Sequence, residues 1–494
     1  MSKKEATISI LLFSAILILN EKGSVADSET FPIPSFDSRF YYGGRWIRNE
    51  TTSHGVAARA DWPCSSIEFV LEWDCAIPEN LEEVINREKS QEENSLLEGG
   101  AERRTSYIEL SMFNLRTRMA VKITPMQKSS LQTNLEQYIE GPSYSISPPG
   151  SDIYDAPQKV KIELPNECIA AGPSKKNRYL IALVKLNEAE PFAPGIGNTL
   201  LRPSVVNFYG ISDASSGIRI IAKNEGFHSQ KVHLEFVGAS DTAGYCVDGT
   251  PDIGMVDGFL NGWKYGNCDY GFPGRITNLL EQDSHDQNTT KKIDYSYSVI
   301  AIAGIGLLQN ANHAFEWIMG PGTMLDYYNR KLLSEPESYI TTGLDKDPVL
   351  TIVSLGGNDY NHQNGDVPTQ EEFSQGMATF LMEKVWIDPN SVMFKRVLLI
   401  CGMGWPQEVD VDPDNNRCRP CPYVQKAALD WNDKHPDMKV GYKFIPCDGS
   451  VVPNLNGTQD MGCLDHKNRH GQMHVAEFLK PRIEEEIQIF LGGT

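Results

Sequence analysis

The chain has no excess of basic residues, and this argues against one large class of function. Its 494 residues hold 45 Lys and Arg against 65 Asp and Glu, which gives a formal net charge of -20 at pH 7. A protein that binds nucleic acid needs a basic patch or stripe to meet the phosphates. The composition therefore argues against nucleic-acid binding, and it is compatible with a neutral partner such as a polysaccharide.

The chain also lacks, beyond its first 20 residues, any hydrophobic run long enough to cross a bilayer. The run that exists, Ile8 to Leu19, follows Lys3-Lys4 and precedes the small residues Ser24-Val25-Ala26. A spanning helix needs ~20 apolar residues, whereas this pattern is typical of a secretory signal peptide. We predict a signal peptide over residues 1–26 and a secreted, extracellular protein, and an uncleaved membrane anchor is the alternative. Three N-x-[ST] sequons would carry surface glycans: Asn49, Asn288 and Asn456.

A second close pair of cysteines is missing as well. Cys418-x-x-Cys421 alone has zinc-ligand spacing, and a zinc site wants another such pair, so disulfides are favoured over zinc. An even number of cysteines in an oxidising compartment predicts disulfides, although sequence does not give their pairing. We hypothesise a Cys447–Cys463 bridge around the loop before His466, and a free core thiol at Cys401. The ten cysteines are Cys64, Cys75, Cys168, Cys246, Cys268, Cys401, Cys418, Cys421, Cys447 and Cys463.

No internal repeat is present, and the pattern changes once along the chain. Residues 35–225 contain short alternating runs split by Gly, Pro and Ser, which predicts a β-sandwich with polar insertions. Residues 226–494 alternate apolar runs with helix-length amphipathic segments, which predicts an α/β domain with a parallel sheet covered on both faces. The expected strands are 232–237, 298–303, 349–355, 397–401 and 439–445. The expected helices are 369–385, 422–432 and 474–490, the last with a kink or break at Pro481.

The predicted strand ends carry the elements of ester hydrolysis. The first strand ends in Gly-Ala-Ser and delivers Ser240 to the sheet edge where reactive groups collect. Two later strands end at Gly304 and at Gly356-Gly357-Asn358-Asp359, and His466 precedes the last helix. Ester hydrolysis needs a nucleophile, a base and donors for the oxyanion. Taken alone, Ser240 fits a turn or helix-cap serine better than a nucleophile, and the other blocks reverse that preference in favour of catalysis.

Four blocks in this order carry a family resemblance. Residues 238–245 read Gly-Ala-Ser-Asp-Thr-Ala-Gly-Tyr, 299–306 end in Ala-Gly-Ile-Gly, 356–359 read Gly-Gly-Asn-Asp, and 462–466 end in Asp-His. Together they resemble the blocks of GDSL/SGNH hydrolases, most closely the second family of carbohydrate esterases. The resemblance implies an SGNH-type parallel sheet flanked by helices over 226–494, preceded by a jelly roll. Gly44-Arg45-Trp46 and the run after Trp62 resemble that jelly roll.

The resemblance also implies the role of each site residue. Ser240 is the expected nucleophile and His466 the expected general base. The oxyanion hole would combine the backbone N–H of Ser240, the backbone N–H of Gly304 (with Gly306 as the alternative) and the side-chain amide of Asn358. No metal and no organic cofactor is implied.

The chain departs from the family pattern at two positions. Ala239 stands where Asp is usual. The relatives place the orienting Asp two residues before the histidine, where this chain has Leu464, and Asp465 is directly adjacent. Adjacent side chains in an extended segment point to opposite sides. Two alternatives therefore remain: a triad with Asp465, or a Ser-His dyad oriented by a backbone carbonyl.

The expected function follows from the resemblance. It is a secreted serine esterase that removes acetyl groups from plant-type polysaccharides such as xylan or glucomannan. The alternatives are a carbohydrate-binding protein with a degenerate esterase domain, and an esterase or lipase acting on small or lipid esters. Tyr360 and Trp405 follow strand ends, where each could stack on a sugar or pack in the core.

Overall fold

A computed structural model of the protein describes parts of the first predicted region and most of the second. The signal peptide, Trp405, Asn288 and Asn456 lie outside the described residues. The described residues are 32–52, 55–73, 107–114, 118–125, 135–140, 158–164, 177–187, 206–214, 218–221, 230–254, 264–286, 293–311, 322–331, 333, 349–361, 367–386, 395–403, 418–453 and 459–492.

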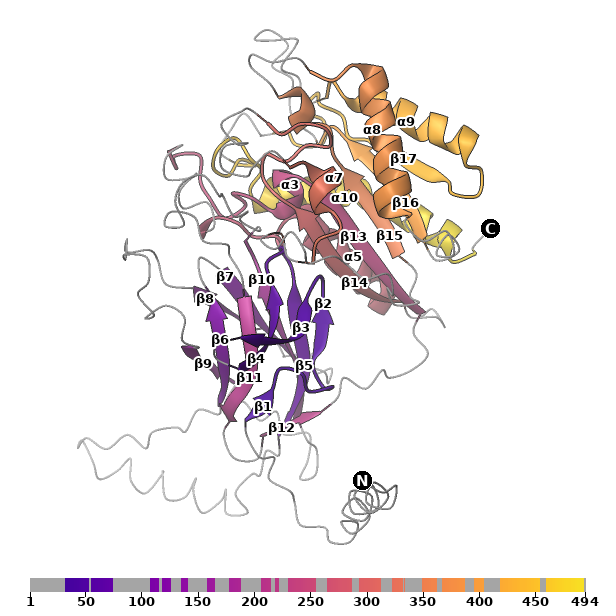
Figure 1. The fold of residues 1–494 in the computed structure, drawn as a ribbon. Coiled ribbons are helices and arrows are strands. Elements are labelled where there is room, and N and C mark those ends of the chain that lie inside the picture. Colours follow the sequence, from indigo (N-terminus) through magenta and orange to yellow (C-terminus); the bar gives the residue numbers. More distant parts are fainter. Residues whose placement is uncertain are drawn as a thin grey trace, which may run out of the picture.

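The first region contains two antiparallel sheets that pack face to face as a β-sandwich (Figure 1). Alternate residues of one central strand, Ile67, Phe69 and Leu71, are fully buried between the sheets, as expected for a strand with one face in the core. One sheet holds β1 (Ile33–Pro34), β3 (Ile47–Thr52), β4 (Gly55–Ala60), β6 (Tyr107–Asn114), β9 (Gln158–Glu163) and β11 (Val206–Ala214). The other holds β2 (Tyr41–Gly43), β5 (Ser66–Trp73), β7 (Arg118–Pro125), β8 (Leu135–Glu140), β10 (Asn177–Lys185) and β12 (Ile218–Ile221).

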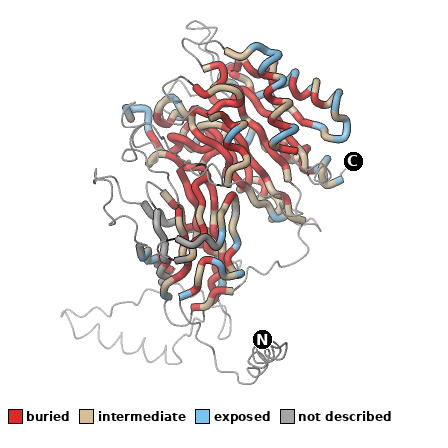
Figure 2. The backbone as a smooth tube through the Cα atoms, in the orientation of Figure 1, coloured by how far each residue is buried: buried red, intermediate tan, exposed pale blue. Residues whose placement is uncertain are grey.

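The second region is built on a parallel sheet with the order β14-β13-β15-β16-β17. All five predicted strands are confirmed, with ends shifted by a few residues. They are β13 (Gln230–Gly238), β14 (Ile293–Ala301), β15 (Val349–Ser354), β16 (Lys395–Cys401) and β17 (Val440–Phe444). Figure 2 shows these strands buried beneath the helices.

Helices cover both faces of the parallel sheet. α8 (Gln370–Phe380), continued by a π-helical turn at Leu381–Val385, and α9 (Cys421–Lys434) contribute to one buried cluster. α5 (Phe272–Asp286) and α10 (Arg469–Phe490) contribute to the other. Neighbouring residues of β13 divide between the clusters, with Val237 in the first and Phe236 in the second. This two-sided burial explains the continuous apolar strand pattern.

Two of the helices differ from the sequence-based expectation. α5 was not predicted, although it spans 15 residues. α10 begins at Arg469 rather than at residue 474. Asn468 caps this earlier start by accepting hydrogen bonds from His470 N and Gly471 N. Pro481 lies inside α10, and the helix is assigned without a break there.

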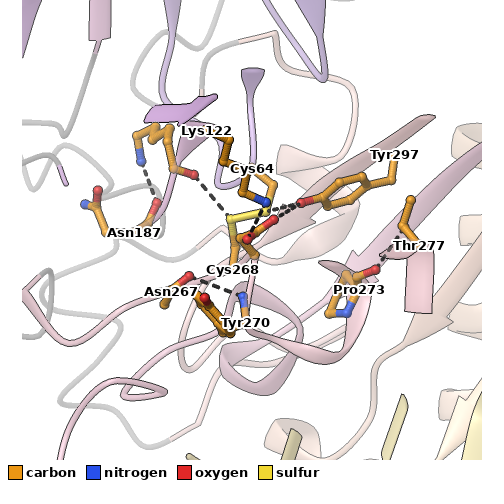
Figure 3. Close-up of a disulfide and its surroundings, with 11 residues drawn as sticks. Cys64, Lys122, Asn187, Asn267, Cys268, Tyr270, Pro273, Thr277 and Tyr297 are labelled. Carbon is orange, nitrogen blue, oxygen red and sulfur yellow. Dashed lines mark hydrogen bonds and ion pairs between the residues drawn. A yellow bond between two sulfur atoms is a disulfide. The ribbon is translucent and has the colours of Figure 1, made fainter. Parts of the chain in front are cut away.

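The two regions share a covalent and a polar junction. Cys64, between β4 and β5, forms a disulfide with Cys268 at the start of the segment leading to α5 (Figure 3). The Tyr297 hydroxyl lies 3.2 Å from Cys64 Sγ and 3.2 Å from Asp269 Oδ1. The buried Arg45 guanidinium lies 3.4 Å from Glu235 in β13, so a cation of the sandwich neutralises a buried carboxylate of the parallel sheet.

The disulfides correct two predictions. Cys447 pairs with Cys418 rather than with Cys463, and Cys401 is bonded to Cys421 instead of being a free thiol. The reason is the order of the elements. Cys401 ends β16 and Cys421 begins α9, whereas Cys447 follows β17, the neighbour of β16 in the sheet, so these cysteines meet at one end of the sheet. Cys463 pairs with Cys246, and Cys75 and Cys168 lie outside the described residues. No helix in the described ranges is long and apolar enough to cross a membrane.

Candidate active site

Ser240 lies where the chain leaves the central strand of the parallel sheet. β13 ends at Gly238, and Ser240 opens the short helix α3 (Ser240–Ala243). A Cβ at Gly238 would sit 2.1 Å from Thr242 Oγ1, so only glycine permits this close turn. Gly244, with φ of +71°, ends the turn in the left-handed region. Ala239 packs against the apolar cluster of α8 and α9.

Ser240 and Asn358 line one cavity at the carboxyl edge of the sheet. The walls come from the segments that follow β13, β14, β15 and β16, as expected for a site at the carboxyl ends of parallel strands. Much of the lining is glycine or other small residues. The lining residues are Ala239, Ser240, Asp241, Thr242, Ile305, Ser354, Leu355, Gly356, Gly357, Asn358, Ile400, Cys401, Gly402 and Met403.

The segment after β14 is held against this cavity by Asn358 and Asp359. Asn358 Nδ2 donates a hydrogen bond of 2.7 Å to Ile305 O. An amide nitrogen carries two donor hydrogens, so a second remains for a ligand. Gly304 has φ of +77°, which favours glycine. The Gly306 N–H donates to Asn310 Oδ1 at 3.1 Å, so that N–H is already engaged and Gly304 remains the better candidate for an oxyanion donor.

Asp359 is the anchor of that segment, and its role was not predicted. Its buried carboxylate accepts hydrogen bonds from the backbone N–H groups of Leu307, Leu308 and Gln309 at 2.9, 2.6 and 3.2 Å. Such donors favour the ionised form, but burial disfavours it more strongly and raises the pKa of Asp359 to about 6. Asp359 thereby couples the loop after β14 to the neighbouring Asn358.

His466 lies in a tight hairpin just before α10. The hairpin is closed by a bridge between Met461 and Lys467, and its tip residues Leu464 and Asp465 both have positive φ. His466 Nδ1 lies 2.7 Å from Leu464 O. A protonated Nδ1 donating to this carbonyl leaves Nε2 unprotonated, which is the form a general base requires. The side chain of Asp465 is exposed.

The His466 hairpin is clamped to the turn that holds Ser240. Cys463 forms a disulfide with Cys246, six residues after Ser240. Lys467, fully buried, donates to Asp241 Oδ1 at 2.9 Å. The Tyr245 and His466 rings meet edge to face with centroids 5.0 Å apart. The segments of the proposed nucleophile and base are therefore neighbours, tied by a covalent bond and a buried ion pair.

The ion pair of this clamp, between Asp241 and Lys467, was missed by sequence reasoning. Asp241 and Lys467 each directly follow a proposed catalytic residue, and this pairing of opposite charges was the available signal. Tyr360 is 1% exposed and its hydroxyl donates to Pro368 O at 2.9 Å, so core packing rather than sugar stacking describes it. Trp62 is likewise fully buried, so it packs in the core.

Removing the Cys246–Cys463 disulfide should damage catalysis more than removing Cys64–Cys268. The two bonds close loops of 217 and 204 residues, so their effects on unfolded-chain entropy are nearly equal. Only the Cys246–Cys463 bond holds the His466 hairpin. We expect Cys246→Ser/Cys463→Ser to lose about 10²-fold in kcat/KM toward an aryl acetate, as a displaced catalytic group does. The Cys64→Ser/Cys268→Ser control should stay near the wild-type value, and equal losses would contradict the clamp.

The pKa of Asp359 predicts a pH-dependent stability difference. Because the folded chain raises this pKa above its ordinary value of 3.8, the stabilisation is present below pH 4 and is lost as pH rises through about 6. Asp359→Asn removes the titration. We expect Asp359→Asn to lower the free energy of unfolding most near pH 4. The difference from wild type should shrink by up to about 3 kcal/mol by pH 7. Urea unfolding of both proteins at pH 4 to 7 measures this, and a penalty that grows with pH would refute it.

The chain was compared with known proteins and solved structures. It matches no family model and no curated protein. Among solved structures, a family two carbohydrate esterase from Clostridium thermocellum in complex with cellohexaose matches with a TM-score of 0.54 at 16% identity, covering 91% of this chain and 99% of that one. A carbohydrate esterase family 2 enzyme from Corynascus thermopiles (Myceliophthora fergusii) matches with a TM-score of 0.55 at 14% identity, covering 92% and 99%.

A third solved structure, an acetyl xylan esterase from the rumen bacterium Butyrivibrio proteoclasticus, matches with a TM-score of 0.54 at 12% identity, covering 91% of this chain and 96% of that one. Likeness at these identities establishes the fold, and it spans both regions. The predicted fold class is thereby confirmed: this chain has the two-part fold of the family two carbohydrate esterases, in which a jelly-roll β-sandwich precedes an SGNH-type parallel sheet.

Proposed function

We propose that this protein is a serine esterase that removes acetyl groups from polysaccharides. The observation that carries the proposal is the clamp between the Ser240 turn and the His466 hairpin, beside a cavity lined by Asn358. A nucleophile, a base with an oriented imidazole and oxyanion donors on neighbouring segments are the parts that acyl transfer requires.

The proposed reaction proceeds in two steps. Ser240 Oγ attacks the ester carbonyl while His466 Nε2 takes its proton. The oxyanion accepts hydrogen bonds from the N–H groups of Ser240 and Gly304 and from the Asn358 amide. Collapse breaks the bond between the carbonyl carbon and the sugar oxygen. That oxygen takes the proton from His466 and leaves as a hydroxyl, and an acetyl group remains on Ser240. Water, deprotonated by His466, then releases acetate and restores the serine.

We propose that Leu464 O, rather than Asp465, orients the base. The carbonyl lies 2.7 Å from His466 Nδ1, whereas the Asp465 side chain is exposed. A carbonyl fixes the ring and the tautomer as a carboxylate does, although it adds no charge to balance the imidazolium. The left-handed conformation of both tip residues is what turns the carbonyl back toward the ring.

The acyl group and the polymer are inferred from the cavity and from the shared fold. Gly356, Gly357 and Gly402 keep the walls beside Ser240 close to the backbone, which suits an acetyl group better than a long acyl chain. Solved proteins with this fold include an acetyl xylan esterase and an esterase bound to cellohexaose. Acetylated xylan or glucomannan is therefore the proposed substrate class.

We also propose that the protein is secreted. The amino-terminal pattern of charge, apolar core and small residues supports this, and so do the four disulfides in the described residues, because disulfides persist in oxidising compartments. Sequencing the amino terminus of the protein recovered from culture medium should give a start at Asp27.

Ser240→Ala should abolish acetate release from acetylated xylan and glucomannan while the protein stays folded. We expect a loss of at least about 10⁴-fold in kcat, since the nucleophile is gone. Ser354→Ala is the matched control, because Ser354 lines the same cavity at the end of β15, and it should remain active.

Three outcomes of that assay separate the alternatives. Wild-type protein that binds the polysaccharide without releasing acetate would favour a binding protein with a degenerate site. Faster hydrolysis of long-chain esters than of acetylated polymer would favour a lipid esterase. Turnover retained by Ser240→Ala would remove this serine from the mechanism.

A second kinetic comparison distinguishes the dyad from the triad. Asp465→Ala should keep kcat near the wild-type value, whereas loss of a triad carboxylate costs about 10⁴-fold. His466→Ala should lose activity as Ser240→Ala does. If Asp465→Ala and His466→Ala were equally impaired, Asp465 would be the orienting acid and the carbonyl would have no catalytic role.

A further inference from the structure

A cluster of potential metal ligands lies on the side of the His466 hairpin facing α10, and the proposed reaction does not use it. The carboxylate of Asp460, which is fully buried, immediately precedes the hairpin. His470 and His474 follow it, one turn apart in the first turns of α10. One ligand atom from each residue lies within 4.8 Å of the others.

The geometry of these three groups suits one divalent cation. His470 Nδ1 lies 2.5 Å and His474 Nε2 lies 3.8 Å from the same oxygen, Asp460 Oδ1. Around a tetrahedral zinc ion with bonds of about 2.1 Å, neighbouring ligand atoms are separated by about 3.4 Å. Shifts of under about 1 Å would therefore bring all three atoms into place. The two imidazoles lie edge to face with centroids 4.6 Å apart, so both rings border the same space.

The ligand types and the solvent exposure of the two histidines favour a transition-metal ion such as zinc over calcium or magnesium. Two imidazoles with one carboxylate are ligands that zinc accepts, whereas calcium and magnesium prefer oxygen ligands. The His470 and His474 side chains are 52% and 29% exposed, so an ion can enter from solvent. Histidines at positions i and i+4 of a helix share one face, as in known zinc sites.

The cations next to the cluster each form an ion pair with another carboxylate, and the described thiols are oxidised. Arg469 binds Asp248 at 2.5 Å and Lys467 binds Asp241 at 2.9 Å, so both cations are directed to other carboxylates. The eight cysteines in the described ranges are all in disulfides, so no thiolate among them offers zinc a stronger site.

We propose that Asp460, His470 and His474 form a zinc site that fastens the His466 hairpin to α10. The first ligand precedes the hairpin and the other two follow it, so one ion closes the loop that contains His466. The site has a structural role. The ion does not take part in the ester chemistry, and its binding is measured independently of activity.

The test is zinc binding by the full mature chain, purified without a histidine tag and stripped with a chelator. Calorimetric titration with zinc chloride should give saturable binding of one ion per chain. Zinc should raise Tm by a few degrees, because an ion that binds only the folded chain stabilises it. Cobalt(II) should give a visible absorption band typical of tetrahedral coordination.

Single-ligand variants and a control locate the site. His474→Ala should weaken zinc binding more than about tenfold and abolish the Tm rise. His470→Gln serves as the second variant if His474→Ala fails to fold, as judged by circular dichroism. His435→Asn, which removes a histidine at the end of α9, should bind zinc as wild type does.

Two results would overturn the proposal: no stoichiometric zinc binding by the wild-type chain, or equal affinity in the wild-type, His470→Gln and His474→Ala proteins. Ser240→Ala should bind zinc as wild type does, because Ser240 is not a ligand. Zinc binding therefore tests the metal site even if the esterase proposal fails.

Discussion

The buried ion pair between Lys467 and Asp241 is the contact on which the proposed site depends. Each partner directly follows a proposed catalytic residue, His466 and Ser240, so their 2.9 Å contact joins the two segments that carry those residues. Removing one partner of a buried pair typically costs about 3–5 kcal/mol, because the other charge is left uncompensated. The Cys246–Cys463 bond reinforces the same contact covalently. Two segments more than 200 residues apart in sequence thus behave as one structural unit.

The opposite wall of the cavity is preorganised in a comparable way. Asp359 holds three consecutive N–H groups of the segment after β14, and the adjacent Asn358 binds the same segment through Ile305 O. Breaking such a buried set leaves unsatisfied donors, each costing about 1–3 kcal/mol. The position of Gly304 is therefore fixed before any substrate binds. Electrostatic stabilisation of an oxyanion depends on donors that need not reorganise during reaction.

The sequence predicted the overall frame of the fold, a β-sandwich followed by a parallel sheet covered by helices. β15 and β16 carried a continuous apolar signal, because both faces of these central strands are buried. α5 gave a weak signal, since Pro273 and Gly274 open it and polar residues end it. The disulfide partners were unpredictable because pairing depends on which strand ends meet. The predicted bridge at Cys447 and the free thiol at Cys401 failed for that reason.

The orientation of the base could not be read from sequence for a different reason. The group beside His466 Nδ1 is a backbone carbonyl, which every residue possesses and no motif can single out. The left-handed conformations of Leu464 and Asp465 direct the Leu464 carbonyl to the ring. Neither residue type by itself predicts a left-handed conformation. Asp465 was conspicuous as a carboxylate next to the histidine, yet its side chain is exposed.

We propose that His466 activates Ser240 in the folded chain. Covalent labelling with a fluorophosphonate, followed by peptide mass spectrometry, measures this activation. We expect one adduct, on Ser240, formed rapidly in the wild-type protein and lost in His466→Ala, with folding intact in both. Labelling of Ser240 at the same rate without His466, or labelling of a different serine, would contradict it.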